Sequence, residues 1–150
     1  MKEALEEAKK AYALGEIPIG AVIVKDGKII GRGHNLTESE KDPTTHAEIN
    51  AIRMATKELG GWRLEDCTMY VTVEPCTMCA GAIVLARIPK LVIGVMDTKA
   101  GACGSVFNVI EEEKLNHQVQ VKTGVMADEC RGIIQDFFKE LRNKKSQNKK

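Results

Sequence analysis

Apolar residues follow two different periods along the chain, and each change of period marks an expected element. An apolar stripe at helical spacing predicts a helix over residues 2–14. Residues 19–24 and 28–31 are short apolar runs of strand length, and the Asp26-Gly27 pair between them favours a tight hairpin turn. The chain therefore opens with a helix followed by a β-hairpin.

Farther along, a polar loop over residues 35–43 leads to a helix that begins near His46, with Thr44 or Thr45 as its cap. The remaining expected elements are a helix end at Gly60-Gly61, a strand at 68–73, a helix at 76–87, a strand at 91–95, a Gly-rich loop at 97–105, a short helix at 106–112, a strand at 119–122 and a helix at 128–142. This order predicts an α/β protein, a single-domain three-layer α/β/α fold with a mixed five-stranded sheet. In such a sheet, ligands bind beyond the carboxyl ends of the strands.

The formal net charge is only +1, but basic residues gather at the C-terminus. They are Lys139, Arg142, Lys144, Lys145, Lys149 and Lys150, against Glu140 alone. We expect a domain over residues 1–143 and a basic tail over residues 144–150. The patch is either a phosphate-binding surface or a solubilising, frayed tail.

Several classes of protein are excluded by what the chain lacks. No apolar run reaches the roughly 20 residues that a membrane helix needs, so we expect no membrane partner. The acidic, amphipathic N-terminus is not a signal peptide. Five cysteines, an odd number that includes a C-x-x-C pair, favour metal or thiol chemistry in a reducing compartment. We therefore expect a cytoplasmic protein.

His46, Cys76 and Cys79 carry the clearest chemistry in the sequence. Zinc prefers imidazole nitrogen and thiolate sulfur in a tetrahedron, and both cysteines open one helix while the histidine opens another. Three protein ligands leave a fourth position for water. Glu48 follows the histidine by two positions, about 200° around a helix, so it is a candidate proton carrier rather than a ligand. The main alternative is a structural zinc site closed by Cys103.

The other cysteines and one helix have simpler interpretations. Cys67 and Cys130 are best explained as buried apolar thiols. Residues 79–86 are apolar almost all round, which indicates burial on more than one side. The second cover is either a partner subunit or another helix of the same chain.

The spaced signature H-x-E…P-C-x-x-C is that of the zinc-dependent nucleoside and base deaminases. The chain resembles the bacterial tRNA-specific adenosine deaminases of the TadA type, in the cytidine/deoxycytidylate deaminase superfamily. The segments that carry the resemblance are 15–21, 42–48, 74–82, 86–89, 101–105, 116–117 and 137–142. The resemblance implies a cytidine deaminase-like fold and a homodimer with one zinc ion per subunit.

The resemblance also implies an activity, the hydrolytic deamination of the wobble adenosine (position 34) to inosine in a tRNA anticodon stem-loop. Glu48 would take a proton from the activated water and deliver it to N1 of the flipped adenine. Hydroxide would attack C6, and the same carboxyl would then protonate the leaving ammonia.

By similarity, Asn35 is expected to hydrogen-bond the target nucleotide, although it also suits an ordinary turn. Backbone near Gly20 and Ala21 is expected to line the pocket, and Asp97 to face the nucleotide 5′ of the target. In the last helix, Phe137 continues the apolar row and Phe138 lies toward its edge.

Near Arg142, that edge ring at Phe138 can pack against a splayed anticodon base. The alternative is that both phenylalanine rings are core. Lys139 lies one turn from Arg142, and the two cations could contact phosphates together.

Two other functions stay open on the sequence alone. A deaminase of free guanine, cytosine or cytidine has the same signature but needs no phosphate-binding surface. A structural-zinc RNA-binding module would have neither an open fourth zinc position nor a carboxylate beside it.

Overall fold

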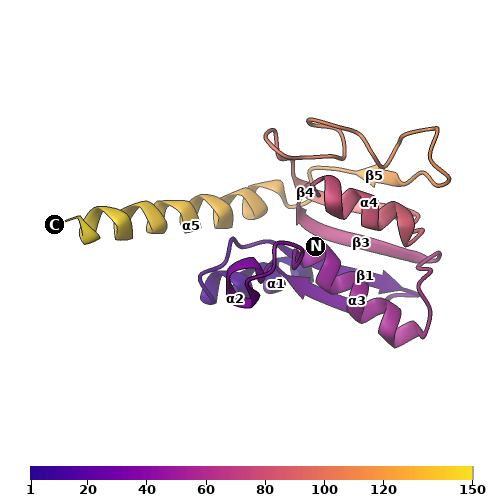
Figure 1. Ribbon diagram of the computed structural model, residues 1–150, viewed down its shortest axis with the longest axis horizontal. Coiled ribbons are helices and arrows are strands. Elements are labelled where there is room, and N and C mark those ends of the chain that lie inside the picture. The colour runs from indigo at the N-terminus through magenta and orange to yellow at the C-terminus, as the bar shows by residue number, and fades with distance from the viewer. Residues whose placement is uncertain (150) are drawn as a thin grey trace.

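A computed structural model describes residues 1–149 (Figure 1). Its elements are α1 (Lys2–Ala13), β1 (Gly20–Lys25), β2 (Lys28–His34), α2 (Thr37–Glu40), α3 (Ala47–Leu59), β3 (Cys67–Val73), α4 (Thr77–Leu85), β4 (Lys90–Val95), β5 (Gln120–Lys122) and α5 (Ala127–Asn148). The strands form one sheet in the order β2-β1-β3-β4-β5. The pairs of β1 with β2 and β3 are antiparallel, and β3-β4 and β4-β5 are parallel. The predicted mixed five-stranded sheet is confirmed.

Glycines in the sheet mark where helices pack on it. A Cβ at Gly20 would collide with α1, whereas Cβ atoms at Gly31 and Gly33 would collide with α3. A Cβ at Gly94 would meet Cys130 of α5. Because neighbouring residues of a strand point to opposite faces, α1 and α5 cover one face while α3 and α4 cover the other. The expected α/β/α layers are confirmed.

The strand directions bring three chain segments to one edge of the sheet. β2, β3 and β4 run the same way, so their carboxyl ends meet there (Figure 1). Asn35 follows β2, the Pro75-Cys76 pair follows β3 at an interval of one residue, and Asp97 follows β4. The first turns of α3 and α4 lie at the same edge as these segments.

The helix expected at residues 106–112 is wrong. The backbone N–H groups of Val106 and Val109 donate to carbonyls of residues 101 and 102, and Cys103 forms an isolated bridge with Asn108. These partners, five and seven residues back along the chain, replace the bonds to the residue four positions back that a helix needs. The segment therefore folds back on the Gly-rich loop instead of coiling.

The caps expected for α3 and one loop also need correction. Neither threonine caps α3, because the hydroxyls of Thr44 and Thr45 both donate to Asp42 and His46 is the N-cap residue. The expected polar loop contains the short helix α2, whose start is held by Glu16.

α5 extends to Asn148, beyond the predicted end at residue 142, because no Gly or Pro interrupts it after Gly132. Residues 144–148 of the expected tail thus continue α5, and Lys150 lies outside the described residues. Over residues 1–149, none of the helices is long and apolar enough to cross a membrane.

Candidate active site

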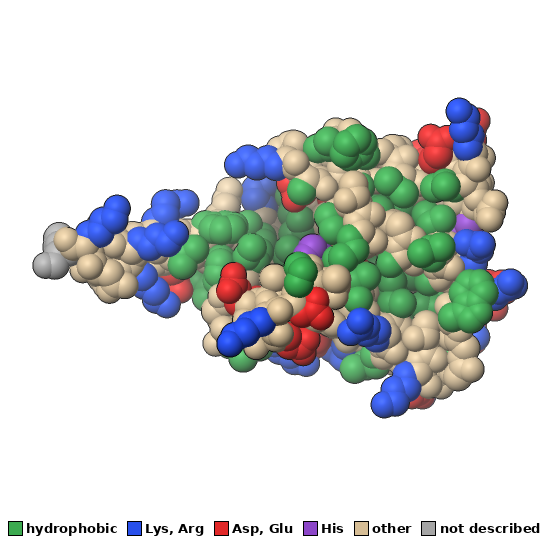
Figure 2. Space-filling view, in the orientation of Figure 1, with side chains coloured by type: hydrophobic (Ala, Val, Ile, Leu, Met, Phe, Trp, Pro, Cys, Tyr) green, Lys and Arg blue, Asp and Glu red, His purple; other side chains and the backbone are tan. Residues whose placement is uncertain are grey.

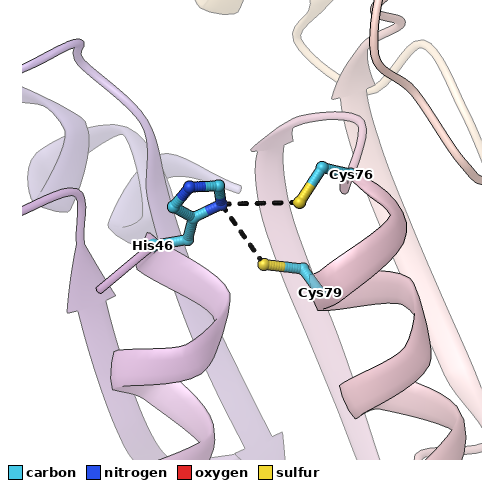
Figure 3. Close-up of side chains that lie close together, drawn as sticks. All are labelled: His46, Cys76 and Cys79. Atoms are coloured by element: carbon cyan, nitrogen blue, oxygen red, sulfur yellow. Dashed lines mark hydrogen bonds between the residues drawn. The ribbon is translucent and has the colours of Figure 1, made fainter. Parts of the chain in front are cut away.

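Two helix starts place three metal-ligand side chains together (Figure 3). His46 is the N-cap of α3 and Cys76 the N-cap of α4, both with extended backbone, and Cys79 lies in the first turn of α4. The imidazole Nδ1 lies 3.5 Å from each of the two sulfur atoms. All three ligand atoms lie within 4.8 Å of one another, a group positioned to hold a metal ion.

The three side chains of this group share protons with one another, which shifts their pKa values. A hydrogen bond from the neighbouring Cys79 thiol lowers the pKa of Cys76 to about 3. That shared proton and burial both raise the pKa of Cys79, and the bond to Cys76 raises the pKa of His46. A bound cation would displace these shared protons and take the two sulfur atoms and the imidazole nitrogen as its ligands.

Glu48 lies beside this group but outside it. Its side chain is 4% exposed, and burial raises the pKa of its carboxyl to about 7, with a further increase from the charge on Cys76. Within residues 1–149, the group of candidate ligands includes neither Glu48 nor Cys103. The Cys103 thiol is buried and points to the carbonyl of Pro75.

A cavity of about 550 Å³ opens next to these residues. Its walls come from the α1–β1 loop, the start of α2, the first turn of α3, the segment after β3, the loop after β4, and α5. The lining residues are Gly15, Glu16, Ile17, Ile19, Asn35, Thr37, Glu38, His46, Ala47, Glu48, Val73, Glu74, Cys76, Asp97, Ala100, Phe137, Phe138 and Leu141. Apolar walls with a few convergent polar groups are typical of small-molecule sites.

Asn35 and Asp97 both line this cavity. The Asn35 side-chain oxygen accepts hydrogen bonds from the backbone N–H (3.3 Å) and hydroxyl (2.6 Å) of Thr37. Because a backbone N–H can only donate, these bonds fix the orientation of the amide. None of residues 1–149 accepts a hydrogen bond from its NH₂ group. One carboxylate oxygen of Asp97 accepts the N–H groups of Lys99 and Ala100.

Gly20 and Ala21 do not reach the cavity, which Ile19 lines instead. The N–H of Gly20 donates to the hydroxyl of Thr72 at 3.1 Å, and Ala21 is fully buried in the sheet. The expected backbone near Gly20 and Ala21 is thus represented at this wall by the adjacent Ile19.

Phe137 and Phe138 both line the cavity but differ in exposure. Phe137 is 9% exposed and packs edge-on against Tyr12, whereas Phe138 is 36% exposed. Arg142 lies outside the cavity, in an adjoining groove that shares Phe138 with it. That groove also includes Lys99, so two cations border it.

Two buried carboxylates of the site were missed by sequence reasoning. Glu16 accepts the N–H groups of Glu38 and Ser39 and so holds α2 at one wall. Glu74 accepts N–H groups from the loop after β4 at the opposite wall. Burial raises the pKa of Glu74, but the stronger effect of these donors and of the Ser105 hydroxyl lowers it overall.

Comparison with known proteins gives consistent matches over nearly the whole chain. Residues 1–142 match the family described as MafB19-like deaminase. A tRNA-specific adenosine deaminase of Bacillus subtilis (strain 168) is 54% identical over 97% of this chain and 90% of its own length. A solved structure from a study of A-to-I editing by tRNA:A34 deaminases has a TM-score of 0.85 and 45% identity, over 89% of this chain and 96% of that one. A guanine deaminase of Bacillus subtilis has a TM-score of 0.62 and 34% identity, over 95% and 90% of the two chains.

The fold, the metal-ligand group and the buried carboxyl beside it define an enzyme of the deaminase class. The match over residues 1–142 shows that the chain belongs to the MafB19-like deaminase family. Within it, the chain is similar to proteins that carry the name tRNA-specific adenosine deaminase. The resemblance found in the motifs is confirmed.

Proposed function

We propose that this protein hydrolytically deaminates adenosine 34 of a tRNA anticodon to inosine. The observation that carries the proposal is a cavity of about 550 Å³ beside the metal-ligand group, which shares Phe138 with a groove bordered by Lys99 and Arg142. A free base would occupy only the cavity, whereas a nucleotide in an RNA strand also presents phosphates to such cations. The relatives' names support the same substrate.

We propose zinc as the metal, one ion per subunit, held by His46, Cys76 and Cys79. Zinc–sulfur bonds of about 2.3 Å and zinc–nitrogen bonds of about 2.0–2.1 Å separate nitrogen and sulfur by about 3.5 Å in a tetrahedron. The observed nitrogen–sulfur separations, 3.5 Å for both cysteines, fit that geometry. When bound, zinc would supply Lewis acidity that lowers the pKa of a water molecule.

The protein's own residues would then orient the base and move protons. Glu48, buried at the cavity wall, would carry a proton from water to N1 of the adenine and a later proton to the departing ammonia. Asn35 would donate its NH₂ group to the target nucleotide. Asp97 would face the nucleotide 5′ of the target, and Phe138 and Arg142 would contact the anticodon loop.

We propose the cytoplasm as the compartment of this reaction. All five cysteines are free thiols in the structure, and such chains are typical of reducing compartments.

One comparison of substrates tests the proposal. An anticodon stem-loop with adenosine 34 should yield inosine, whereas free adenosine, guanine and cytidine should react far more slowly. The same stem-loop with guanosine at position 34 is the control. Efficient deamination of free guanine would instead favour the activity that the guanine deaminase of Bacillus subtilis carries in its name.

A further inference from the structure

Glu74 is a buried carboxylate that touches both the metal-ligand segment and the opposite loop of the cavity. It lies between β3 and Pro75-Cys76, and its side chain is 4% exposed. Its own N–H donates to the carbonyl of Val95 at 2.9 Å. The residue thus joins the carboxyl ends of β3 and β4 immediately before the first cysteine ligand.

The Glu74 carboxylate accepts four hydrogen bonds from one loop, residues 97–105. One oxygen accepts the N–H of Asp97 at 2.9 Å and the hydroxyl of Ser105. The other accepts the N–H groups of Cys103 and Ser105, each at 3.0 Å. Both ends of the loop are therefore tied to a single side chain.

The loop wraps closely around this carboxylate. A Cβ at Gly101 would collide with all three atoms of the carboxylate group. The N–H of Ala102 also donates to the carbonyl of Pro75 at 2.8 Å, so the loop is bonded to the segment that carries the first cysteine ligand. The carboxylate of Glu74 thus matches one acceptor group to four donors, and a neutral or longer side chain at position 74 would lose that match.

Through the loop, Glu74 sets the position of groups that line the cavity and groove. Asp97 and Ala100 line the cavity, and Lys99 borders the groove next to it. We propose that Glu74 is a positioning residue, which holds residues 97–105 in the form that binds the RNA strand over the metal centre. This inference rests on the proposed function, since it assigns the loop to the same substrate.

The test compares Glu74→Gln with the control Glu113→Gln, which changes an exposed carboxylate outside the cavity. The new amide would turn NH₂ toward backbone N–H donors and loosen the loop. We expect KM for the anticodon stem-loop to rise about tenfold with kcat changed less than about threefold, because binding rather than chemistry is weakened. Zinc content should stay close to that of the wild type, whereas the thermal unfolding temperature should fall, because buried N–H donors lose their acceptor.

Ser105→Ala removes only one of the four donors and covers the case in which Glu74→Gln does not fold. It should raise KM about two- to threefold, in the same direction. An unchanged KM in both variants, or a loss of zinc together with kcat at unchanged KM, would overturn the positioning role.

Hydrogen exchange separates this inference from the proposed function. The N–H groups of Asp97, Cys103 and Ser105 should lose protection in Glu74→Gln, while those of β3 and β4 keep it. If the wild type does not deaminate the stem-loop, the proposed substrate is wrong, and this exchange pattern still decides whether Glu74 holds the loop. Unchanged protection would show that it does not.

Discussion

The roles proposed for Glu48 and for the candidate metal ligands make opposite physical demands, although only two positions separate Glu48 from His46. Ligands must give up protons to a cation, whereas a proton carrier must bind and release a proton at working pH. Burial meets the second demand, because it raises the pKa of the Glu48 carboxyl to about 7. The helix separates the two roles, since positions i and i+2 point in different directions.

Glu48→Gln should therefore separate chemistry from binding. The amide fills the same volume but cannot accept or deliver a proton as a carboxyl does. We expect the deamination rate to fall about 10²-fold or more, with zinc content and RNA affinity close to wild type. Single-turnover rates, metal analysis and binding isotherms measure the three quantities. Near-normal turnover would remove Glu48 from the proposed mechanism.

Asp97 offers a test of sugar selection. A carboxylate can accept a hydrogen bond from a ribose 2′-hydroxyl, which deoxyribose lacks. Asp97→Asn keeps the oxygen that accepts the N–H groups of Lys99 and Ala100, so the loop should stay in place. We expect weaker selection for RNA and higher activity on a DNA hairpin of the same sequence. An unchanged RNA-to-DNA activity ratio would contradict this role.

At the scale of residues, the sequence reveals side chains whose partners follow a fixed spacing. The candidate ligands His46, Cys76 and Cys79 follow such a spacing, and the structure brings them together. Glu16 and Glu74 leave no comparable pattern, because their partners are backbone N–H groups of distant segments. Any amino acid except proline supplies such a donor, so only the folded chain identifies these two glutamates.

α5 combines two environments along one helix. Its first half packs on the sheet through Cys130 and Phe137, both buried. From residue 139 onward every described side chain is exposed, and the helix projects from the body of the protein (Figure 1). Figure 2 shows Lys and Arg side chains along this projecting part. Hydrophobic packing therefore holds the N-terminal half of α5 on the sheet, whereas the exposed C-terminal part is mainly charged.

Two α5 variants should affect RNA binding in different ways. Truncation after Asn143 removes diffuse positive charge, so the affinity for RNA should fall modestly. The affinity should also depend less on salt: the slope of log K against log salt concentration should fall by about 0.7 for each lost phosphate contact to single-stranded RNA. Arg142→Ala should weaken binding of the anticodon loop itself, because this side chain borders the groove beside Phe138. Stacking on such a ring contributes about 1–3 kcal/mol per base.

Binding isotherms on an isolated stem-loop at several salt concentrations measure both effects, with zinc content and folding as controls. If neither variant differs from the wild type, the end of α5 is structural and the RNA lies elsewhere.

At the scale of elements, the pattern of apolar and polar residues predicts helices, strands and turns best where their hydrogen-bond partners lie nearby in the sequence. The Asp26-Gly27 hairpin was predicted correctly, because both residues adopt the positive φ angles that this turn requires. The helix expected at residues 106–112 was wrong, since the Gly-rich loop supplies its hydrogen-bond partners. Such a fold-back depends on tertiary contacts, which periodicity does not record.

Over the whole molecule, the two faces of the sheet are covered unequally. α1 and α5 pack on one face and contact each other, whereas α4 on the other face contacts only α3 among the described helices and buries one side, Cys79, Ala80, Ile83 and Val84. Its outward residues Met78, Gly81, Ala82 and Leu85 follow helical spacing, and Leu85 is 69% exposed. Met54 and Trp62, in α3 and just after it, are also exposed. Hydrophobic side chains gather over this face in Figure 2.

We therefore predict a homodimer through the α3–α4 face. Among the helices described in residues 1–149 only α3 contacts α4, and it leaves Leu85 69% exposed, so burial inside one chain does not cover this side of α4. Exposed apolar patches of this kind mark interaction surfaces, and a second copy would bury them symmetrically. Sedimentation at micromolar concentration should show a species of twice the 16.5 kDa chain mass.

Leu85→Glu should shift the dimer toward monomer, because association would bury an unpaired charge in an apolar interface. Leu14→Glu, which changes another exposed leucine next to α1 on the opposite face, should leave the association unchanged. If the wild type sediments only at 16.5 kDa, the α3–α4 face is not a dimer interface. If both variants dissociate the dimer equally, the interface also lies elsewhere, because only Leu85→Glu alters the α3–α4 face.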